Sequence, residues 1–157
     1  MKIKKLFYTI IFALILFSCK SRSITYNHTK IVKLQENGYS VFFDTLKINF
    51  KNFYSSKEQV NRITKNKRNK TINIKSKGNS DIIESENLKN KTIKNLSIPE
   101  FGLLIIDEYP VSSENLKTNV LIDLNSIKNI KILSKKNYQD KFPHLDLKGG
   151  IVILQTK

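Results

Sequence analysis

The chain has no tryptophan, one cysteine and two histidines among its 157 residues. A single cysteine excludes an internal disulfide, so the fold must be held together by its hydrophobic core. The longest apolar run, Leu6 to Phe17, extends only about 18 Å as a helix, whereas a hydrocarbon core is about 30 Å thick, so this run is too short to cross a membrane. Because tryptophan is absent, we interpret six aromatic residues as core, with a ligand groove as the alternative: Tyr39, Phe42, Phe43, Phe50, Phe53 and Tyr54.

The chain also lacks the motifs of common enzyme active sites. It contains no Gly-x-Ser-x-Gly, no His-Glu-x-x-His and no glycine-rich phosphate loop. Asp107 and Glu108 are adjacent, so their side chains point to different sides and do not form a carboxylate pair. His28 has no further ligand residue at metal spacing, and His144 is interpreted as a loop side chain beside a proline. We therefore expect no enzyme, no cofactor and no metal; a catalytic lipoprotein of unknown type is the alternative.

The first 19 residues have the order of an export signal. Lysines at positions 2, 4 and 5 precede the apolar run, which ends in Leu16-Phe17-Ser18-Cys19. This ending resembles the cleavage box of bacterial lipoproteins, in which a small residue directly precedes the modified cysteine. The resemblance implies that residues 1–18 are removed and that acylated Cys19 anchors the protein in the outer membrane of the bacterial envelope, facing the periplasm. An ordinary secretory signal with an incidental cysteine is the alternative.

Basic residues outnumber acidic ones by 28 to 13, which gives a net charge of +15. Removal of residues 1–18 takes away three lysines, so the mature chain keeps a charge of +12. In the envelope the abundant polyanions are phosphates of phospholipid and lipopolysaccharide, which attract each nearby lysine or arginine by about 1 kcal/mol. We therefore expect no nucleic-acid partner. A binding module for anionic envelope lipid or glycan is one hypothesis, and a charge that only keeps the protein soluble is the alternative.

The positive charge is densest between Lys47 and Lys77, where ten basic residues accompany one acid, Glu58. Such a charge run is typical of a solvated loop, and a specific anion site is the functional alternative. The candidate anion-binding residues are Lys65, Lys67, Arg68 and Lys70.

Hydrophobic patterning predicts one folded domain over residues 31–157, preceded by a flexible polar tether over residues 19–30. Residues 39–43 and 46–50 are expected to form two strands joined by a turn at Asp44-Thr45, and residues 71–75 another strand. Ser55-Ser56 resembles a helix N-cap, and Val60 and Ile63 would give the short helix an apolar stripe. Residues 78–94 have weak periodicity and are interpreted as an irregular excursion.

Three short runs rich in β-branched residues dominate the C-terminal third: Leu103 to Ile106, Ile130 to Leu133 and Ile151 to Leu154. Turn residues bound each run, so we expect three buried strands in one sheet. Asp107 follows the first run and is interpreted as a turn former whose carboxylate accepts backbone N–H groups ahead of Pro110.

These three segments resemble the plug domain of TonB-dependent outer-membrane receptors. Leu103 to Pro110 is similar to the plug sequence aliphatic-aliphatic-Ile-Asp-Gly-x-Pro, matching at Asp107 and Pro110, with Glu108 in place of glycine. Residues 123–133 are similar to a plug segment in which a turn capped by Asn or Asp leads into an Ile-x-x-Ile-x-Val-Leu strand. Gly149, Gly150 and the residues after them resemble the closing plug sequence Gly-Val-Ile-x-Ile-x-Thr-Lys. The Tyr-Gly pair and the arginine usual before the final glycine are absent.

The resemblance implies an α+β or mixed α/β fold, a small plug-like mixed β-sheet with short helices. It covers about 55 residues of 157. In a receptor the closing strand leads into a barrel, and here the sequence stops at Lys157, so we do not expect transport by this chain itself. The expected role is a non-catalytic binding or adaptor module that contacts an envelope protein and is held to the membrane through Cys19.

The sequence also suggests two related strand–helix–strand halves. Ser55-Ser56 follows one expected strand and Ser112-Ser113 follows another, and an Ile-x-Ile strand comes later in both cases. One approximate copy is weak evidence for a repeat.

Overall fold

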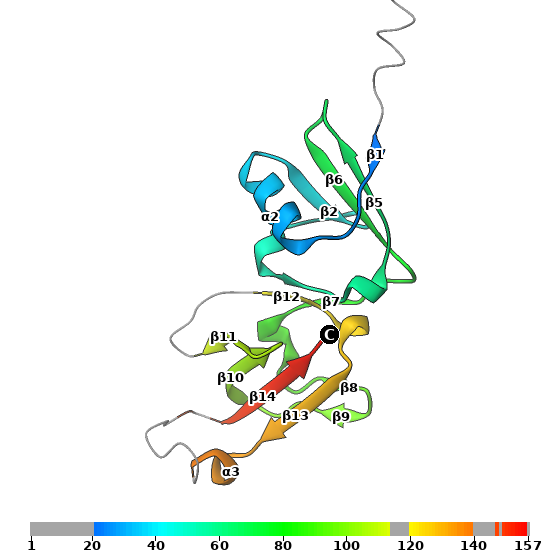
Figure 1. Ribbon diagram of the computed structural model, residues 1–157. Helices are drawn as coiled ribbons and strands as arrows, with labels where there is room; N and C mark the ends of the chain where they lie inside the picture. Colours follow the sequence, from blue (N-terminus) through cyan, green and yellow to red (C-terminus); the bar gives the residue numbers. More distant parts are fainter. Residues whose placement is uncertain (1–20, 114–119, 140–146, 148, 157) are drawn as a thin grey trace, which may run out of the picture. The chain divides into compact units, whose positions relative to one another are not determined.

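The computed structural model describes residues 21–113, 120–139, 147 and 149–156 (Figure 1). Two short helices and several small mixed sheets give it the predicted α+β content. Cys19, the segment 1–18 and His144 lie outside the described residues. Among the helices that are described, none is long and apolar enough to span a membrane.

The chain divides into two compact units, where the sequence analysis expected one domain over residues 31–157. Unit 1 comprises Met1–Ile48 and Arg62–Lys75, and unit 2 comprises Asn49–Asn61 and Ser76–Lys157. The chain therefore passes between the units three times, so neither unit is one continuous stretch of sequence.

Unit 1 contains a five-stranded sheet with the order β1-β5-β6-β2-β3. β2 pairs with β3 in antiparallel and with β6 in parallel orientation. A turn of four residues joins β5 to β6, which makes this pair antiparallel, because a parallel pair needs a long crossover. The bounds are Arg22–Ser23 for β1, Ser40–Phe43 for β2, Leu46–Ile48 for β3, Val60–Asn66 for β5 and Thr71–Ser76 for β6.

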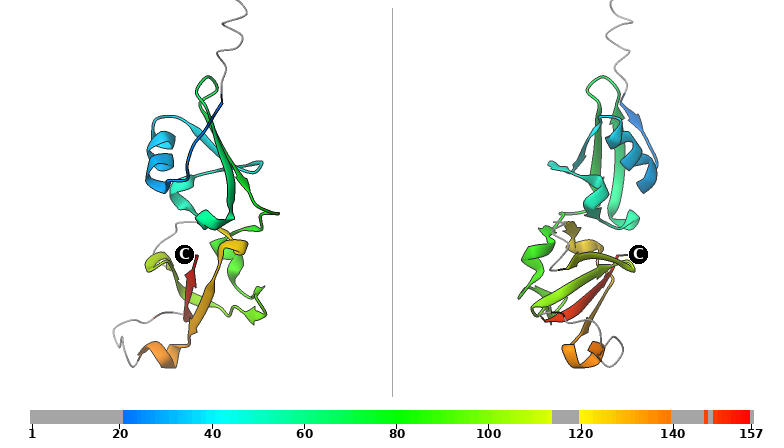
Figure 2. Two further views of the ribbon diagram at one scale, coloured as in Figure 1. Left: turned by 45° about the vertical axis from the view of Figure 1, so that its right-hand side comes forward. Right: turned by 90° about the vertical axis from the view of Figure 1, so that its left-hand side faces the viewer.

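The core of unit 1 follows from the alternation of side chains along these strands. Val41 lies opposite Ile72 and Phe43 opposite Ile74, and all four are buried. Helix α2 (His28–Glu36) lies along one face of the sheet and has Ile31 as its buried residue (Figure 2). The strands predicted around Asp44-Thr45 and over residues 71–75 are confirmed.

Regular structure begins upstream of Ile31, within the segment interpreted as a tether. β1 pairs with β5, and the Ile24 N–H donates to the Ile63 carbonyl at 3.0 Å. Asn27 caps α2, since its side chain accepts a hydrogen bond from the Lys30 N–H at 2.9 Å. Residues 21–30 were wrongly interpreted as a tether because backbone pairing and helix capping order them, and neither produces a periodic pattern of apolar residues in the sequence.

The predicted helix after Ser55-Ser56 is wrong. Ser56 does act as an N-cap, but it caps only the 3-10 turn η2 (Lys57–Gln59), and the chain continues directly as β5. Val60 and Ile63 are three residues apart, which fits a helix, but both are β-branched and favour the extended backbone that the sheet requires.

Unit 2 contains a four-stranded sheet with the order β11-β10-β14-β13. The three aliphatic runs therefore share one sheet, as predicted. β10 and β14 are parallel central neighbours, while β11 and β13 pair with them in antiparallel orientation. The bounds are Phe101–Ile106 for β10, Tyr109–Ser113 for β11, Asn129–Leu133 for β13 and Gly150–Gln155 for β14.

Shorter elements surround this sheet in unit 2. A three-stranded sheet has the order β4-β12-β7. β8 lies at the end of the predicted excursion and forms a hairpin with β9, which follows it. Ile98, Leu104, Ile106, Ile122, Val152 and Leu154 lie together in the core, and each is fully buried. The remaining bounds are Phe50–Asn52 for η1, Phe53–Tyr54 for β4, Ile82–Glu84 for β7, Ser85–Leu88 for η3, Thr92–Ile93 for β8, Leu96–Ser97 for β9, Leu121–Asp123 for β12, Leu124–Ser126 for η4 and Lys135–Gln139 for α3.

The two main sheets share one topology over four strands. In both, an antiparallel hairpin supplies one edge and one central strand, a parallel pair forms the centre, and a further strand lies antiparallel on the other side. In unit 1, β1 adds a fifth strand beyond β5. Both hairpins turn at an aspartate with positive φ, 52° at Asp44 and 48° at Asp107. The predicted Ser-Ser correspondence is wrong, since Ser112 pairs with Leu104 inside β11 whereas Ser55-Ser56 precedes η2.

Candidate functional site

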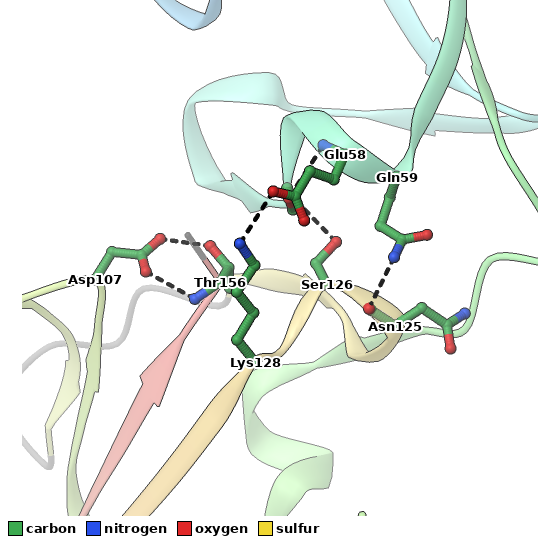
Figure 3. A network of polar contacts seen from close by, with 8 residues as sticks. Glu58, Gln59, Asp107, Asn125, Ser126, Lys128 and Thr156 are labelled. Atoms are coloured by element: carbon green, nitrogen blue, oxygen red, sulfur yellow. Dashed lines mark hydrogen bonds and ion pairs between the residues drawn. The ribbon is translucent and has the colours of Figure 1, made fainter.

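A bond between the turn after β10 and the end of β14 is the first part of the candidate site. The Asp107 carboxylate accepts hydrogen bonds from the Thr156 N–H at 2.8 Å and from the Thr156 hydroxyl at 2.5 Å (Figure 3). The Asp107 N–H donates to the Leu154 carbonyl at 3.0 Å. The carboxylate thus does accept a backbone N–H, but that of Thr156, 49 residues away and directly after β14. Aspartate suits the turn because it tolerates positive φ.

Tyr54 on β4 lies close enough to Asp107 to be affected by its charge. The pKa of Tyr54 is raised above its ordinary value of 10.0, first by burial of the phenol and second by the negative charge of Asp107. Both effects disfavour the phenolate, so Tyr54 is neutral at physiological pH. It therefore contributes a hydroxyl and an apolar ring to this part of unit 2.

A buried carboxylate forms the second part of the site. Asp123 caps η4 and is only 1% exposed. It accepts hydrogen bonds from the Ser126 hydroxyl at 2.8 Å, the Ser55 hydroxyl at 3.2 Å and the Asn125 N–H at 3.2 Å. These donors meet the requirement that a buried charge be hydrogen-bonded. The expected turn capped by Asp ahead of an aliphatic strand is confirmed.

Ser126 links this carboxylate to the turn of η2. Its hydroxyl accepts a hydrogen bond from the Ser56 N–H at 2.8 Å and donates one to the Asp123 carboxylate at 2.8 Å. Two turns 70 residues apart in sequence are thereby joined in a closed network. Exposed contacts continue it, with Lys128 and Glu58 in an ion pair at 3.1 Å and the Gln59 amide donating to the Asn125 carbonyl at 3.1 Å.

The side chains of this arrangement satisfy one another. The Ser55 and Ser126 hydroxyls each have one hydrogen, and both donate it to the Asp123 carboxylate. Across the described part of the chain, every buried side-chain nitrogen or oxygen has a hydrogen-bond partner. Within the same residues, no three histidine, cysteine or acidic side chains gather at metal-binding distance. The network joins two turns of unit 2 through buried hydrogen bonds.

The two glycines of the plug-like sequence are required by close backbone contacts. A Cβ atom on Gly150 would lie 2.6 Å from the Leu133 carbonyl oxygen, on the neighbouring strand β13. Gly149 has a φ of +95°, and a Cβ there would lie 2.9 Å from the Glu100 carbonyl oxygen. Pro110 lies in the edge strand β11, where a missing N–H is tolerated. These positions shape the sheet.

The predicted anion-binding residues lie at the end of β5 and in the turn that follows it. Lys67, Arg68 and Lys70 lie in the exposed turn between β5 and β6. Lys65 belongs to β5 and is half-buried, with its ammonium 4.6 Å from the centre of the Tyr39 ring. A cation over an aromatic face is held by the ring quadrupole, so Lys65 has a structural contact that the charge pattern alone did not predict.

Sequence analysis did not foresee the pairing of Asp107 with Thr156 or of Asp123 with Ser55. The individual residues were quoted in their motifs, but nothing in a single sequence links positions 49 or 68 residues apart. Comparison of the chain with protein-family models, with curated proteins and with solved structures found no match.

Proposed function

We propose that the protein is a lipid-anchored protein of the bacterial envelope whose plug-like unit 2 acts as a non-catalytic binding or adaptor module. The main support is the single sheet of β10, β14 and β13, because the resemblance to receptor plugs rests on these three segments. Asp107 and Thr156, two matching positions of that resemblance, also bond each other. The anchor is inferred from the sequence around Cys19.

An adaptor needs an accessible surface, and the turn between β10 and β11 offers one. Tyr109 follows this turn and is 68% exposed. Tyrosine is enriched in protein interfaces because its ring supplies contact area and its hydroxyl a hydrogen bond. Asp107 ties the turn to Thr156, so a partner would meet a preformed loop and would lose less entropy in ordering it.

Metabolic labelling with an alkyne fatty acid tests the anchor. Cells that express the full chain should yield a labelled protein in the outer-membrane fraction, and Cys19→Ser should abolish the label. The anchor is contradicted if the wild-type chain stays unlabelled and is recovered from the cytosol.

Site-specific photo-crosslinking in intact cells tests the adaptor. A photoreactive amino acid in place of Tyr109 should give one discrete crosslinked species. The same amino acid at Glu86, an exposed residue of η3, is the matched control and should give none. The adaptor role is contradicted if neither position crosslinks and the purified lipoprotein stays monomeric in every detergent and salt tested.

A further inference from the structure

Positive charge is concentrated in unit 1. Residues 49–61 and 76–157 contain 14 basic and 11 acidic residues, which nearly balance. The described part of unit 1 has only two acids, Glu36 and Asp44. Its ten basic residues are Arg22, Lys30, Lys33, Lys47, Arg62, Lys65, Lys67, Arg68, Lys70 and Lys75.

The unit 1 sheet has one face that its own core does not cover. Val41, Phe43, Ile72 and Ile74 point to the covered side and are buried. Phe42 points to the other side, directly opposite Lys47 on β3 and Asn73 on β6. The alternation of side chains places Lys75 beside Asn73, and Arg62 on the side opposite buried Ile63. We call this the open face.

The open face combines exposed cations with an absence of acids among its described residues. Lys47, Arg62 and Lys75 are exposed, and Phe42, opposite Lys47, is half-buried. Glu36 belongs to α2 and Asp44 to the β2–β3 turn, so neither lies on these strands. Lysine and arginine side chains at fixed positions on a sheet attract the phosphates of an anionic surface. The exposed Lys67 and Lys70 of the β5–β6 turn add to the positive charge of unit 1.

The residue types of the open face favour lipid phosphates over single-stranded nucleic acid. Proteins that bind single strands stack successive bases on several aromatic side chains. Phe42 is the one aromatic residue that the described strands place on this face. Binding to headgroup phosphates needs no such stacking, because each lysine or arginine near an anionic membrane acts through its charge.

We propose that the open face of unit 1 docks on an anionic phospholipid surface through Lys47, Arg62 and Lys75. This surface is a second binding site beyond the adaptor role of unit 2. Binding through the open face does not require the acyl chains of Cys19. A negative result for this proposal can therefore be distinguished from a negative result for the proposed function. An acylated chain would then lie against its membrane through unit 1.

Vesicle binding by the unacylated chain 20–157 tests the proposal, since every described helix and strand lies between Arg22 and Gln155. The probes are vesicles of phosphatidylcholine with and without 30% phosphatidylglycerol, and binding is followed by co-sedimentation. The chain should bind only the anionic vesicles, and binding should weaken steeply as salt rises from about 50 to 300 mM. The triple variant Lys47→Gln, Arg62→Gln, Lys75→Gln should bind about a hundredfold more weakly, at about fivefold per residue.

The matched control removes three exposed lysines of unit 2 by Lys51→Gln, Lys57→Gln and Lys131→Gln. It should weaken binding less than about fivefold. The double variant Lys47→Gln, Lys75→Gln should lose about 25-fold and serves if the triple variant does not fold, as judged by circular dichroism. The proposal is overturned if both triple variants weaken vesicle binding equally, or if the chain binds pure phosphatidylcholine vesicles as tightly as the anionic ones. It is also overturned if the chain binds a single-stranded oligonucleotide more tightly than anionic vesicles at the same salt concentration.

Discussion

Asp107 and Thr156 are joined by two hydrogen bonds, so the turn after β10 fixes the end of β14, which lies beside β10 in the sheet. The carboxylate meets both the backbone N–H and the hydroxyl of one residue, and a charged acceptor makes such bonds stronger than neutral ones. Thr156 is 2% exposed, so little water competes for its hydrogen bonds. The contact therefore closes the parallel pair at the centre of unit 2.

Removing this contact should destabilise unit 2. Asp107→Ala leaves the Thr156 N–H and hydroxyl without their acceptor, and we expect a loss of about 2–3 kcal/mol in unfolding free energy. Asp107→Asn keeps one acceptor oxygen and the tolerance of positive φ, so it should cost about half as much. Guanidinium unfolding measures both. Asp81→Ala, at an exposed acid, is the control, and an equal effect at both sites would show that the contact has no special role.

The buried serine network allows a second prediction. Ser126→Ala removes the acceptor of the Ser56 N–H and a donor to Asp123, both in a buried setting. We expect a loss of about 1–3 kcal/mol, because unsatisfied buried groups pay their full desolvation cost. Ser97→Ala, at an exposed residue of β9, should change stability by less than about 0.5 kcal/mol. Equal thermal stability of the two variants would contradict a closed network.

The glycines give a third prediction, with a control inside the same chain. Gly150→Ala places a methyl group 2.6 Å from the Leu133 carbonyl oxygen, where backbone must move to admit it. We expect a loss of about 1–3 kcal/mol, as in other overpacked sites. Gly78→Ala meets nothing within 4 Å and should be neutral or stabilising by up to about 1 kcal/mol. Thermal unfolding compares the two, and a neutral Gly150→Ala would refute the close approach.

Alkaline pH should weaken the fold through Tyr54. Its pKa is raised in the folded state by burial and by Asp107, so the folded protein keeps a proton that the unfolded chain loses near pH 10. This stabilisation is complete below about pH 10 and is lost as pH rises through the folded pKa, so unfolding free energy falls in that range. Tyr54→Phe should reduce the slope, as measured by guanidinium unfolding between pH 8.5 and 11.

Two comparisons complete that experiment. Some slope should remain in Tyr54→Phe, because burial also raises the pKa of Tyr26. Tyr109→Phe, at a residue 68% exposed, is the matched control. An unchanged slope in Tyr54→Phe would contradict the role assigned to Tyr54.

Local pattern was enough to predict the strands with strong alternation or dense aliphatic content. The β2–β3 hairpin, β6, and the common sheet of β10, β13 and β14 all follow from β-branched runs bounded by turn residues. In these elements the strand propensity of the residues, the alternation of apolar and polar positions and the turn residues at the ends all indicate the same structure. They can therefore be predicted from a single sequence.

Elements whose order depends on distant partners could not be predicted. β4 is two residues long and becomes a strand by pairing with β12, far along the chain. β1 likewise forms by pairing with β5. Val60 and Ile63 lie in a strand, although their spacing of three residues fits a helix. The candidate site has the same limit, because the partners of Asp107 and Asp123 are set by the register of strands that are remote in sequence.

Because the chain passes between the units three times, strands of the two units alternate in the order in which they are synthesised. The strands of the unit 1 sheet have all been made once residue 76 emerges from the ribosome, so that sheet can close early. β4 belongs to unit 2 and is synthesised before residue 76. Its partner β12 begins at Leu121 and is synthesised later. A nascent chain between these two points would therefore have one complete sheet and an unpaired β4, and a folding chaperone would be most useful at that stage.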